Sequence, residues 1–383
     1  NESALLGRVG KLAFSHGRGF FEAPFELVIK TPTNGAVIRY TTDGSVPATE
    51  HGEVLEGPLT IGQTTVLRAG AFKPGHKPAK AITQTYLFPK DVVRQSPDGL
   101  PPPGFHYEWG GNRMDYGMDT RVVGDSRYQE KVFDALKAIP SYSLVMGPDD
   151  LFGEENGIYS NAEEDGREWE RPCSLELIRP DGEEGFQTNC GVRIRGGFSR
   201  RASNAKHAFR FFFRREYGPG KLKYPVFGRD AAQVFDNLDL RTFQNYSWSM
   251  SGDPRGIFMR DQLSRDLQLA TGQAGARGDF CHLYINGQYW GLYNTCERPE
   301  ASYGATYFKG KEKDFDVIKI GRGRGNGSGD TRYGCFATDG TLDAWRRLWE
   351  AAKAGLADNA AYQKVLGNLP DGTRNPDYET LLD

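Results

Sequence analysis

The sequence predicts an α+β protein built from a small N-terminal β-sandwich and a larger mixed α/β domain. Short alternating apolar runs, broken by Gly, Pro and Asn, fill residues 14–88, a pattern typical of short strands joined by tight turns. A Pro-rich stretch follows, and beyond it strand-like runs are interspersed with segments of helical periodicity. We therefore place the β-sandwich at 12–89, a linker and lead-in at 90–125, and the second domain at 126–383.

The composition indicates a folded chain without a strong overall charge. The 383 residues are 38% hydrophobic and 26% charged, and the formal net charge is -2. A chain of this size usually forms more than one domain. The balanced charge argues against nucleic acid as a partner, and the lack of about 18 consecutive apolar residues argues against a transmembrane segment.

In the N-terminal module, turn residues separate five runs with strand-like alternation, at 25–29, 37–41, 59–61, 65–71 and 81–87. The run RYTTDGSVP at 39–47 places one strand before an Asp-Gly turn. This stretch resembles the chitobiase C-terminal or fibronectin-associated module, and the resemblance implies an accessory domain without catalysis. Tyr40 and Phe72 are either core residues or a sugar-stacking platform, so carbohydrate stays open as a partner.

The linker is predicted from SPDG at 96–99 and the three prolines at 101–103, which favour turns and polyproline geometry. After it, apolar spacing predicts one helix at 126–139, ended by Pro140. Asn286-Gly287 predicts a tight turn between two strands. The remaining predictions are strands at 141–145, 173–178, 191–195, 208–213, 237–242, 281–285 and 289–295, and helices at 261–270, 343–353 and 359–365.

One of the possible cysteine pairs can be argued from the sequence. A two-residue turn at Asp181-Gly182 would place Cys173 directly opposite Cys190 on neighbouring antiparallel strands. The two are either a disulfide or a pair of small buried side chains. A disulfide would place the chain in an oxidising compartment.

The segment with the clearest chemical character is a basic, glycine-containing loop between two strands. Residues 193–201 read RIRGGFSRR, and KHAFR follows at 206–210. Backbone N–H groups and fixed cations in such a loop can surround a polyphosphate. The alternatives are a solvated basic hairpin, arginine stems laid over Phe209, Phe211 and Phe213, or a nucleic-acid surface, which the rest of the chain does not favour.

With its surroundings, this segment resembles the CotH family of spore-coat-type atypical protein kinases. The matching stretches are RIRG at 193–196, Ser199-Arg200, KHAFR at 206–210, Tyr217-Gly218, LDLR at 238–241, MRDQ at 259–262, NGQYWGLY at 286–293 followed by Glu297, and FDVIK at 315–319. Their order and spacing are jointly specific.

The resemblance implies a kinase-like fold that binds ATP and a divalent metal, Mg²⁺ or Mn²⁺, and phosphorylates Ser or Thr of a partner protein. It makes Lys206 the candidate phosphate-contacting lysine, with Arg195 and Arg200 supporting the phosphates. Glu297 is a candidate to pair with Lys206 or to approach the metal. The resemblance also implies a secreted, extracellular or cell-envelope protein.

In the family, the acidic catalytic and metal-binding segment follows a Leu-Leu-Asp-like stretch, and this chain ends at Leu381-Leu382-Asp383. The resemblance therefore implies an incomplete kinase-like domain whose catalytic base and main metal ligand lie beyond Asp383. We expect this chain to be inactive in phosphoryl transfer. The rival hypothesis is a surface-attached structural or binding protein with a non-catalytic kinase-like scaffold.

Two further segments superficially suggest binding sites. The glycine-rich run at 321–329 lacks the Lys-Ser/Thr ending of a phosphate-binding loop, which favours a surface loop. The acidic residues between 149 and 165 lack the ligand spacing of a calcium loop, which favours a solvated face.

Overall fold

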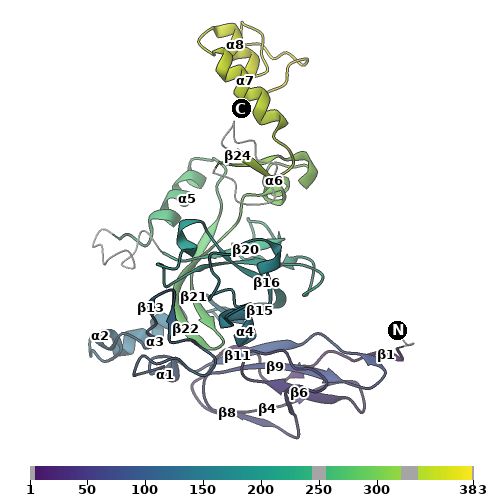
Figure 1. Cartoon of the computed structure of the whole chain (residues 1–383), viewed down its shortest axis with the longest axis vertical. Coiled ribbons are helices and arrows are strands. Elements are labelled where there is room, and N and C mark those ends of the chain that lie inside the picture. The colour runs from purple at the N-terminus through teal and green to yellow at the C-terminus, as the bar shows by residue number, and fades with distance from the viewer. Residues whose placement is uncertain (1–4, 244–255, 321–334, 382–383) are drawn as a thin grey trace. The chain divides into compact units, whose positions relative to one another are not determined.

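A computed structural model describes residues 5–243, 256–320 and 335–381 (Figure 1). The chain divides into two compact units, Asn1–Glu297 and Arg298–Asp383. It is a mixed α/β protein whose N-terminal part is rich in β-strands, as the sequence predicts. The glycine-rich run at 321–329 lies outside the described residues.

The N-terminal module, purple in Figure 1, buries its apolar side chains between a five-stranded sheet and small two-stranded pairs. Leu27, Ile61, Leu67 and Tyr86 belong to this core. The sheet order is β3 (Gly19–Phe20), β11 (Ile82–Leu87), β9 (Thr65–Phe72), β6 (Val37–Thr41) and β7 (Glu53–Val54). The small pairs are β4 (Phe25–Leu27) with β8 (Leu59–Ile61), β2 (Ala13–Phe14) with β5 (Ile29–Lys30), and β1 (Gly7–Arg8) with β10 (His76–Lys77). The run predicted as one strand at 25–29 is therefore divided between β4 and β5.

The second part of the first unit is a closed seven-stranded barrel. Antiparallel pairs form most of it, and parallel pairing of the first strand with β21 closes it. In barrel order the strands are β14 (Ser141–Val145), β15 (Arg171–Ile178), β16 (Gln187–Arg195), β17 (Ala208–Phe212), β20 (Asn237–Arg241), β22 (Gln288–Cys296) and β21 (Gly278–Ile285). Alternate side chains such as Phe209, Phe211, Leu238 and Leu240 are fully buried, which matches the period of two of a strand with one face in a core.

The turn between β21 and β22 confirms the Asn-Gly prediction. Asn286 and Gly287 have φ angles of 47° and 83°, the left-handed conformation that a tight hairpin turn of this kind requires. The Asn286 side chain accepts a hydrogen bond from the Met146 backbone N–H (3.0 Å) and donates one to the Met146 carbonyl (2.9 Å). The turn is therefore fixed to the end of β14 as well as to its own hairpin.

The stretch at 90–125 carries short elements that pack on the barrel. The Gln95 amide donates to the carbonyls of Tyr116 (2.8 Å) and Tyr289 (3.1 Å) and accepts from the Tyr289 N–H (3.0 Å). Trp109 and Tyr116 are buried. The elements here are α1 (Pro89–Val92), β12 (Glu108–Trp109), β13 (Asn112–Arg113) and α2 (Thr120–Val123), and α3 (Gln129–Ala138) then leads into the barrel.

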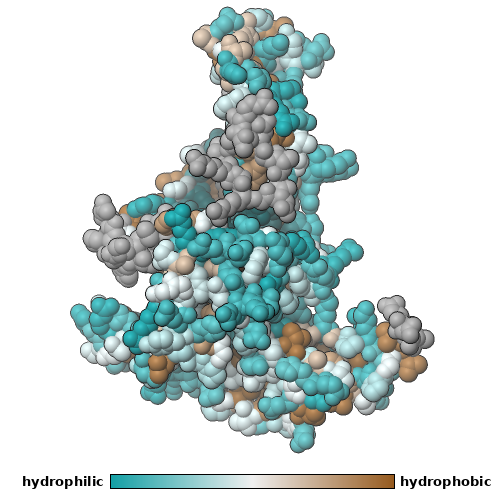
Figure 2. Space-filling model, viewed as in Figure 1, coloured by the Kyte–Doolittle hydropathy of each residue, from teal (hydrophilic) through white to brown (hydrophobic). Residues whose placement is uncertain are grey.

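Besides the barrel strands, the structure contains further helices and short strand pairs. The first unit also contains α4 (Pro148–Phe152), α5 (Arg260–Ala270) and the short pair β18 (Leu222–Lys223) and β19 (Val234–Phe235). The second unit consists of α6 (Ala301–Tyr307), the pair β23 (Val317–Ile320) and β24 (Cys335–Asp339), α7 (Asp343–Ala354) and α8 (Asn359–Val365). None of the described helices is long and apolar enough to cross a membrane. The face drawn in Figure 2 is mostly hydrophilic, with small scattered apolar patches.

A buried ion pair joins the N-terminal module to the barrel. The Glu176 carboxylate on β15 has no exposed surface, and the Arg18 guanidinium contacts it at 2.9 Å (Nε to Oε1). The Thr85 hydroxyl on β11 donates to the same carboxylate and lies 2.7 Å from the Ser143 hydroxyl on β14. Burial raises the pKa of Glu176, while Arg18 and Thr85 favour its charged form. Two groups of the N-terminal module, Arg18 and Thr85, therefore depend on one carboxylate of the barrel.

We expect Glu176→Ala to lower the free energy of unfolding by about 3–5 kcal/mol, because it leaves the Arg18 guanidinium without its buried partner. Urea denaturation measures this loss. Arg18→Met combined with Glu176→Met removes both charges, so the double variant should recover most of the stability. A double variant as unstable as Glu176→Ala would contradict a dominant role for the charge pair.

The cysteine pairing predicted from the sequence is confirmed in register. Cys173 lies directly opposite Cys190. The connection between β15 and β16 spans residues 179–186, however, and is longer than the predicted two-residue turn. The two Sγ atoms are 3.5 Å apart and both thiols are free. Burial and the neighbouring Cys173 raise the pKa of the Cys190 thiol. The disulfide itself stays a prediction.

We expect mild oxidation of the folded protein to link Cys173 to Cys190, because directly opposite strand positions have the Cα separation that a disulfide needs. Peptide mapping by mass spectrometry under non-reducing conditions identifies the bridge. Cys281 serves as the internal control, since its cross-strand partner is Tyr293. Bridges that form at random among the five cysteines would contradict the prediction.

Candidate functional site

The four residues predicted to bind the cofactor sit at ends of barrel strands. Arg195 is the last residue of β16, and Arg200 follows in a short 3₁₀ turn. Lys206 lies two residues before β17, and Glu297 directly follows β22. All four therefore belong to the loop region and strand ends of one barrel, in the first compact unit.

Lys206 lies beside the middle of β22. Its Nζ atom donates to the Leu292 carbonyl (3.3 Å) and lies 4.6 Å from the centre of the Tyr293 ring. Gly291, with φ at 108°, leaves room for it, since a Cβ there would come within 2.6 Å of Nζ. No ion pair of Lys206 is formed with any residue that the structure describes. Burial lowers the pKa of this ammonium to about 8.

The strand register separates Lys206 from Glu297. Lys206 contacts Leu292, whereas Glu297 lies five residues further along the same chain segment, about 16 Å at the rise of a β-strand. The buried Glu297 carboxylate accepts a hydrogen bond from the Arg277 backbone N–H (2.8 Å). The Lys206–Glu297 ion pair that the sequence left as one option is therefore not formed in this structure.

The two predicted arginines are held by carboxylates and carbonyls. The Arg200 guanidinium donates to the carbonyls of Ile194 (2.8 Å) and Glu164 (3.0 Å) and forms an ion pair with Asp165 (3.5 Å). Arg195 forms an ion pair with Asp239 at 3.0 Å. Burial is the main cause that lowers the pKa of both guanidinium groups, and Asp239 and Asp165 oppose it. Both arginines thus contribute to the internal structure of the loop.

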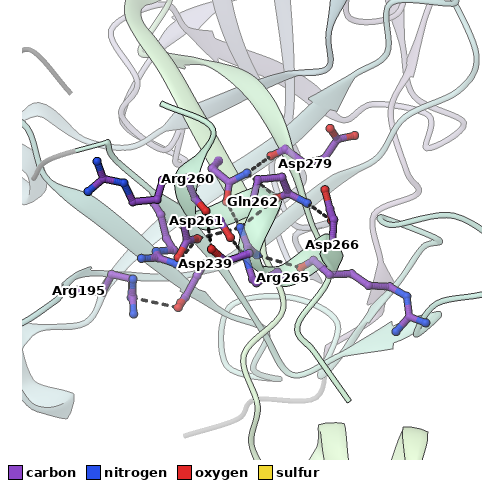
Figure 3. Close-up of polar contacts among 12 residues, drawn as sticks. Arg195, Asp239, Arg260, Asp261, Gln262, Arg265, Asp266 and Asp279 are labelled. Atoms are coloured by element: carbon purple, nitrogen blue, oxygen red, sulfur yellow. Dashed lines mark hydrogen bonds and ion pairs between the residues drawn. The ribbon is translucent and has the colours of Figure 1, made fainter. Parts of the chain in front are cut away.

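Asp239, on β20, is the centre of a charged network that sequence reasoning did not assign to the site (Figure 3). Its carboxylate, 2% exposed as a residue, accepts from Arg210 at 2.6 and 2.9 Å in addition to its contact with Arg195. The signal in the sequence is the alternation of LDLR, because an acid between two buried leucines of a strand must point to the opposite face. Arg210 in KHAFR alternates in the same way on the neighbouring strand.

The network extends to the start of α5. Arg241, which ends β20, forms an ion pair with Asp261 (2.5 Å), and Arg265 contacts the same carboxylate (3.0 Å). Figure 3 shows Asp261, Gln262 and Arg265 of α5 in the same cluster of polar contacts as Asp239. Gln262 links Asn294 on β22 (3.0 Å) to Asp266 on the helix (2.7 Å). The MRDQ segment therefore holds α5 against the barrel.

The acidic residues between 149 and 165 are mostly exposed, as the sequence predicts, and two of them also contact the basic loop. The Glu163 carboxylate accepts from the Ala202 N–H (3.0 Å), and Asp165 pairs with Arg200. On the other side of the loop, the Asn112 amide donates to the Ala202 carbonyl (2.6 Å). The buried His207 lies 4.3 Å from the Trp109 ring, centre to centre. The loop that carries Arg200 and Lys206 is thus fixed from two directions.

A closed barrel with a fixed cationic loop, preceded by a β-rich accessory module, defines a modular protein with a candidate anion site at one set of strand ends. Residues 192–359 match the family model of the CotH kinase protein, and residues 17–84 match that of the chitobiase/beta-hexosaminidase C-terminal domain. Both matches confirm the resemblances predicted from the sequence. The CotH match includes all four predicted site residues. No curated protein matches the chain.

We expect Lys206→Met to stabilise the protein at pH 7 by about 1–2 kcal/mol, a value reduced for the partial exposure of this side chain. The native pKa of about 8 lies below the ordinary 10.5, so the native state binds this proton less tightly than the unfolded chain. The wild-type protein therefore regains stability as the pH rises from 8 to 10.5, and the advantage of the variant should shrink over that window.

Urea denaturation at pH 7 and pH 10 measures this difference between the two proteins. Lys223→Met, at an exposed lysine of β18, is the matched control and should show the same small effect at both pH values. An advantage of Lys206→Met that is independent of pH would mean that the Lys206 ammonium is not desolvated.

Proposed function

We propose that this chain carries a CotH-type, kinase-like domain that binds the phosphates of ATP at the Lys206 loop. The single observation that supports the proposal most is the CotH match over residues 192–359, which spans the loop and its partner strands. The proposal extends to a type of atypical protein kinase domain that transfers phosphate to Ser or Thr of a partner protein, although we expect no phosphoryl transfer from this chain. A secreted, extracellular or cell-envelope location belongs to the same proposal.

Lys206 fits a phosphate contact by its surroundings. Its ammonium forms no ion pair within the described part of the chain, and its other contacts are a carbonyl and an aromatic ring. A cation in this state gains more from a polyphosphate than a cation already paired with a carboxylate. A bound phosphate would also raise the pKa of this lysine from about 8 and so stabilise its charged form.

Arg195 and Arg200 fit a different role. Their guanidinium groups are engaged by Asp239 and Asp165, so we propose that they hold the loop in place and do not themselves contact phosphate. For the divalent metal, Mg²⁺ or Mn²⁺, no group of three or more His, Cys, Asp or Glu residues among those described is arranged to hold an ion. We therefore derive no step through a metal.

A structural or binding role without catalysis is the second candidate. The observation in its favour is that two of the three predicted phosphate-binding cations are already neutralised inside the molecule. The accessory module at 17–84 supports the same candidate, since such a domain suits attachment to a surface or a carbohydrate. Nucleotide binding separates the two candidates.

Calorimetric titration of ATP with Mg²⁺ or Mn²⁺ tests the proposal. We expect saturable binding by the wild-type chain and a loss of about 10- to 100-fold in Lys206→Ala, the range of one hydrogen bond to a charged group. Lys223→Ala should bind like the wild type. Unchanged affinity in Lys206→Ala would exclude Lys206 as a phosphate contact, and no binding by the wild type would favour the second candidate.

A further inference from the structure

Arg68 is a buried cation at the junction between the N-terminal module and the barrel. It lies on β9, where Leu67 and Ala69 point into the module's own core, so Arg68 points to the opposite face of the sheet. That face meets the barrel, since Cys173 of β15 lines the same cavity. Arg68 is only 4% exposed.

The Arg68 guanidinium has no carboxylate partner within residues 5–243, 256–320 and 335–381. Its single hydrogen bond runs from Nη1 to the Gly44 carbonyl (2.9 Å), and its buried Nε has no hydrogen-bond partner. Burial lowers the pKa of Arg68, and Glu176, Asp150 and Asp43 act on it only through space. Buried charges in proteins are normally paired, so this guanidinium lacks the anion that its environment requires.

A cavity of about 490 Å³ opens beside Arg68. Its walls are largely apolar and come from both parts of the unit: Val46, Pro47, Phe72, Pro78 and Pro172. Lys80 is the second cation of the lining. The one acid that lines the cavity, Glu216, is already paired with Arg167 at 2.5 Å. The volume lies in the range of pockets that hold small organic molecules.

We propose that this cavity binds a small organic carboxylate, with Arg68 as the group that receives the carboxylate and the proline and phenylalanine walls in contact with an apolar face of the ligand. Nη1 of Arg68 is already bonded to the Gly44 carbonyl, so the remaining N–H groups of the guanidinium are the ones that can donate to a carboxylate. The walls favour a compact ring over a free inorganic ion. A sugar acid or the C-terminal residue of a peptide presents this chemistry. The site is separate from the Lys206 loop and does not depend on the proposed function.

Calorimetric titration with four probes tests the proposal on the full chain. The probes are glucuronate, glucose as its neutral counterpart, N-acetylproline as a carboxylate of peptide type, and inorganic phosphate. We expect saturable binding of at least one of the two carboxylates, no binding of glucose, and weaker binding of phosphate. The preference between glucuronate and N-acetylproline identifies the source. Failure of both carboxylates to bind, or tighter binding of phosphate, would overturn the proposal.

Arg68→Met should lose at least ten-fold in affinity for the bound carboxylate. Arg39→Met is the matched control, because Arg39 on the neighbouring strand makes the same kind of bond, from Nη1 to the Gly52 carbonyl (2.8 Å), and does not line the cavity. The control should bind as the wild type does. Equal affinity of Arg68→Met and wild type, or an equal loss in both variants, would overturn the assignment of Arg68.

Thermal unfolding without ligand gives a second readout of Arg68. Removing an unpaired buried charge should leave Arg68→Met with a melting temperature equal to or several degrees above that of the wild type. A clearly lower value would show that Arg68 is already satisfied inside the protein. Ala48→Trp, at an exposed position on the rim of the cavity, should block carboxylate binding without a change in melting temperature, and retained binding would exclude the cavity.

Discussion

Closure of the seven-stranded barrel by the parallel pairing of β14 with β21 is the constraint on which the first unit depends. Closure fixes every strand register, because a one-residue slip in any pair would move its buried side chains to the opposite face. The registers in turn decide which charges meet. Asp239 faces Arg210 across one pair and Cys296 across the next, while Lys206 is brought to Leu292 and kept away from Glu297.

The closed barrel also explains how carboxylates can be buried on its strands and their edges. Glu170, just before β15, has no exposed side-chain surface and pairs with Arg193 (2.6 Å) and Arg214 (2.9 Å). Asp239 is held in the same way by two arginines, and Glu176 is held by Arg18 and the Thr85 hydroxyl. Each acid stabilises an adjacent segment only while its partners remain, since a buried charge left alone carries a large desolvation cost.

The sequence predicted those strands, helices and turns well whose signal lies within a few neighbouring residues. The strands at 37–41, 59–61 and 141–145 and the helix at 359–365 have the predicted bounds, and the Asn286-Gly287 turn follows from backbone conformation alone. The packing of 90–125 on the barrel was not predictable from Pro and Gly content, because composition reports turns and not the surfaces that cover them. The Cys173–Cys190 register was predictable because cross-strand pairing follows from position in a hairpin.

The site was less predictable, because it depends on contacts between segments that lie far apart in the sequence. RIRGGFSRR shows that cations are present, but only the register and the fold reveal that Asp239 and Asp165 neutralise Arg195 and Arg200. Arg68 gave no signal at all, since its lack of a partner is a property of the junction between two parts of the unit. A buried cation that is already paired with a carboxylate stabilises the fold, and its remaining electrostatic attraction for a ligand is small. Among the cations considered, the positive charge available for ligands therefore rests on Lys206 at the barrel and Arg68 at the junction.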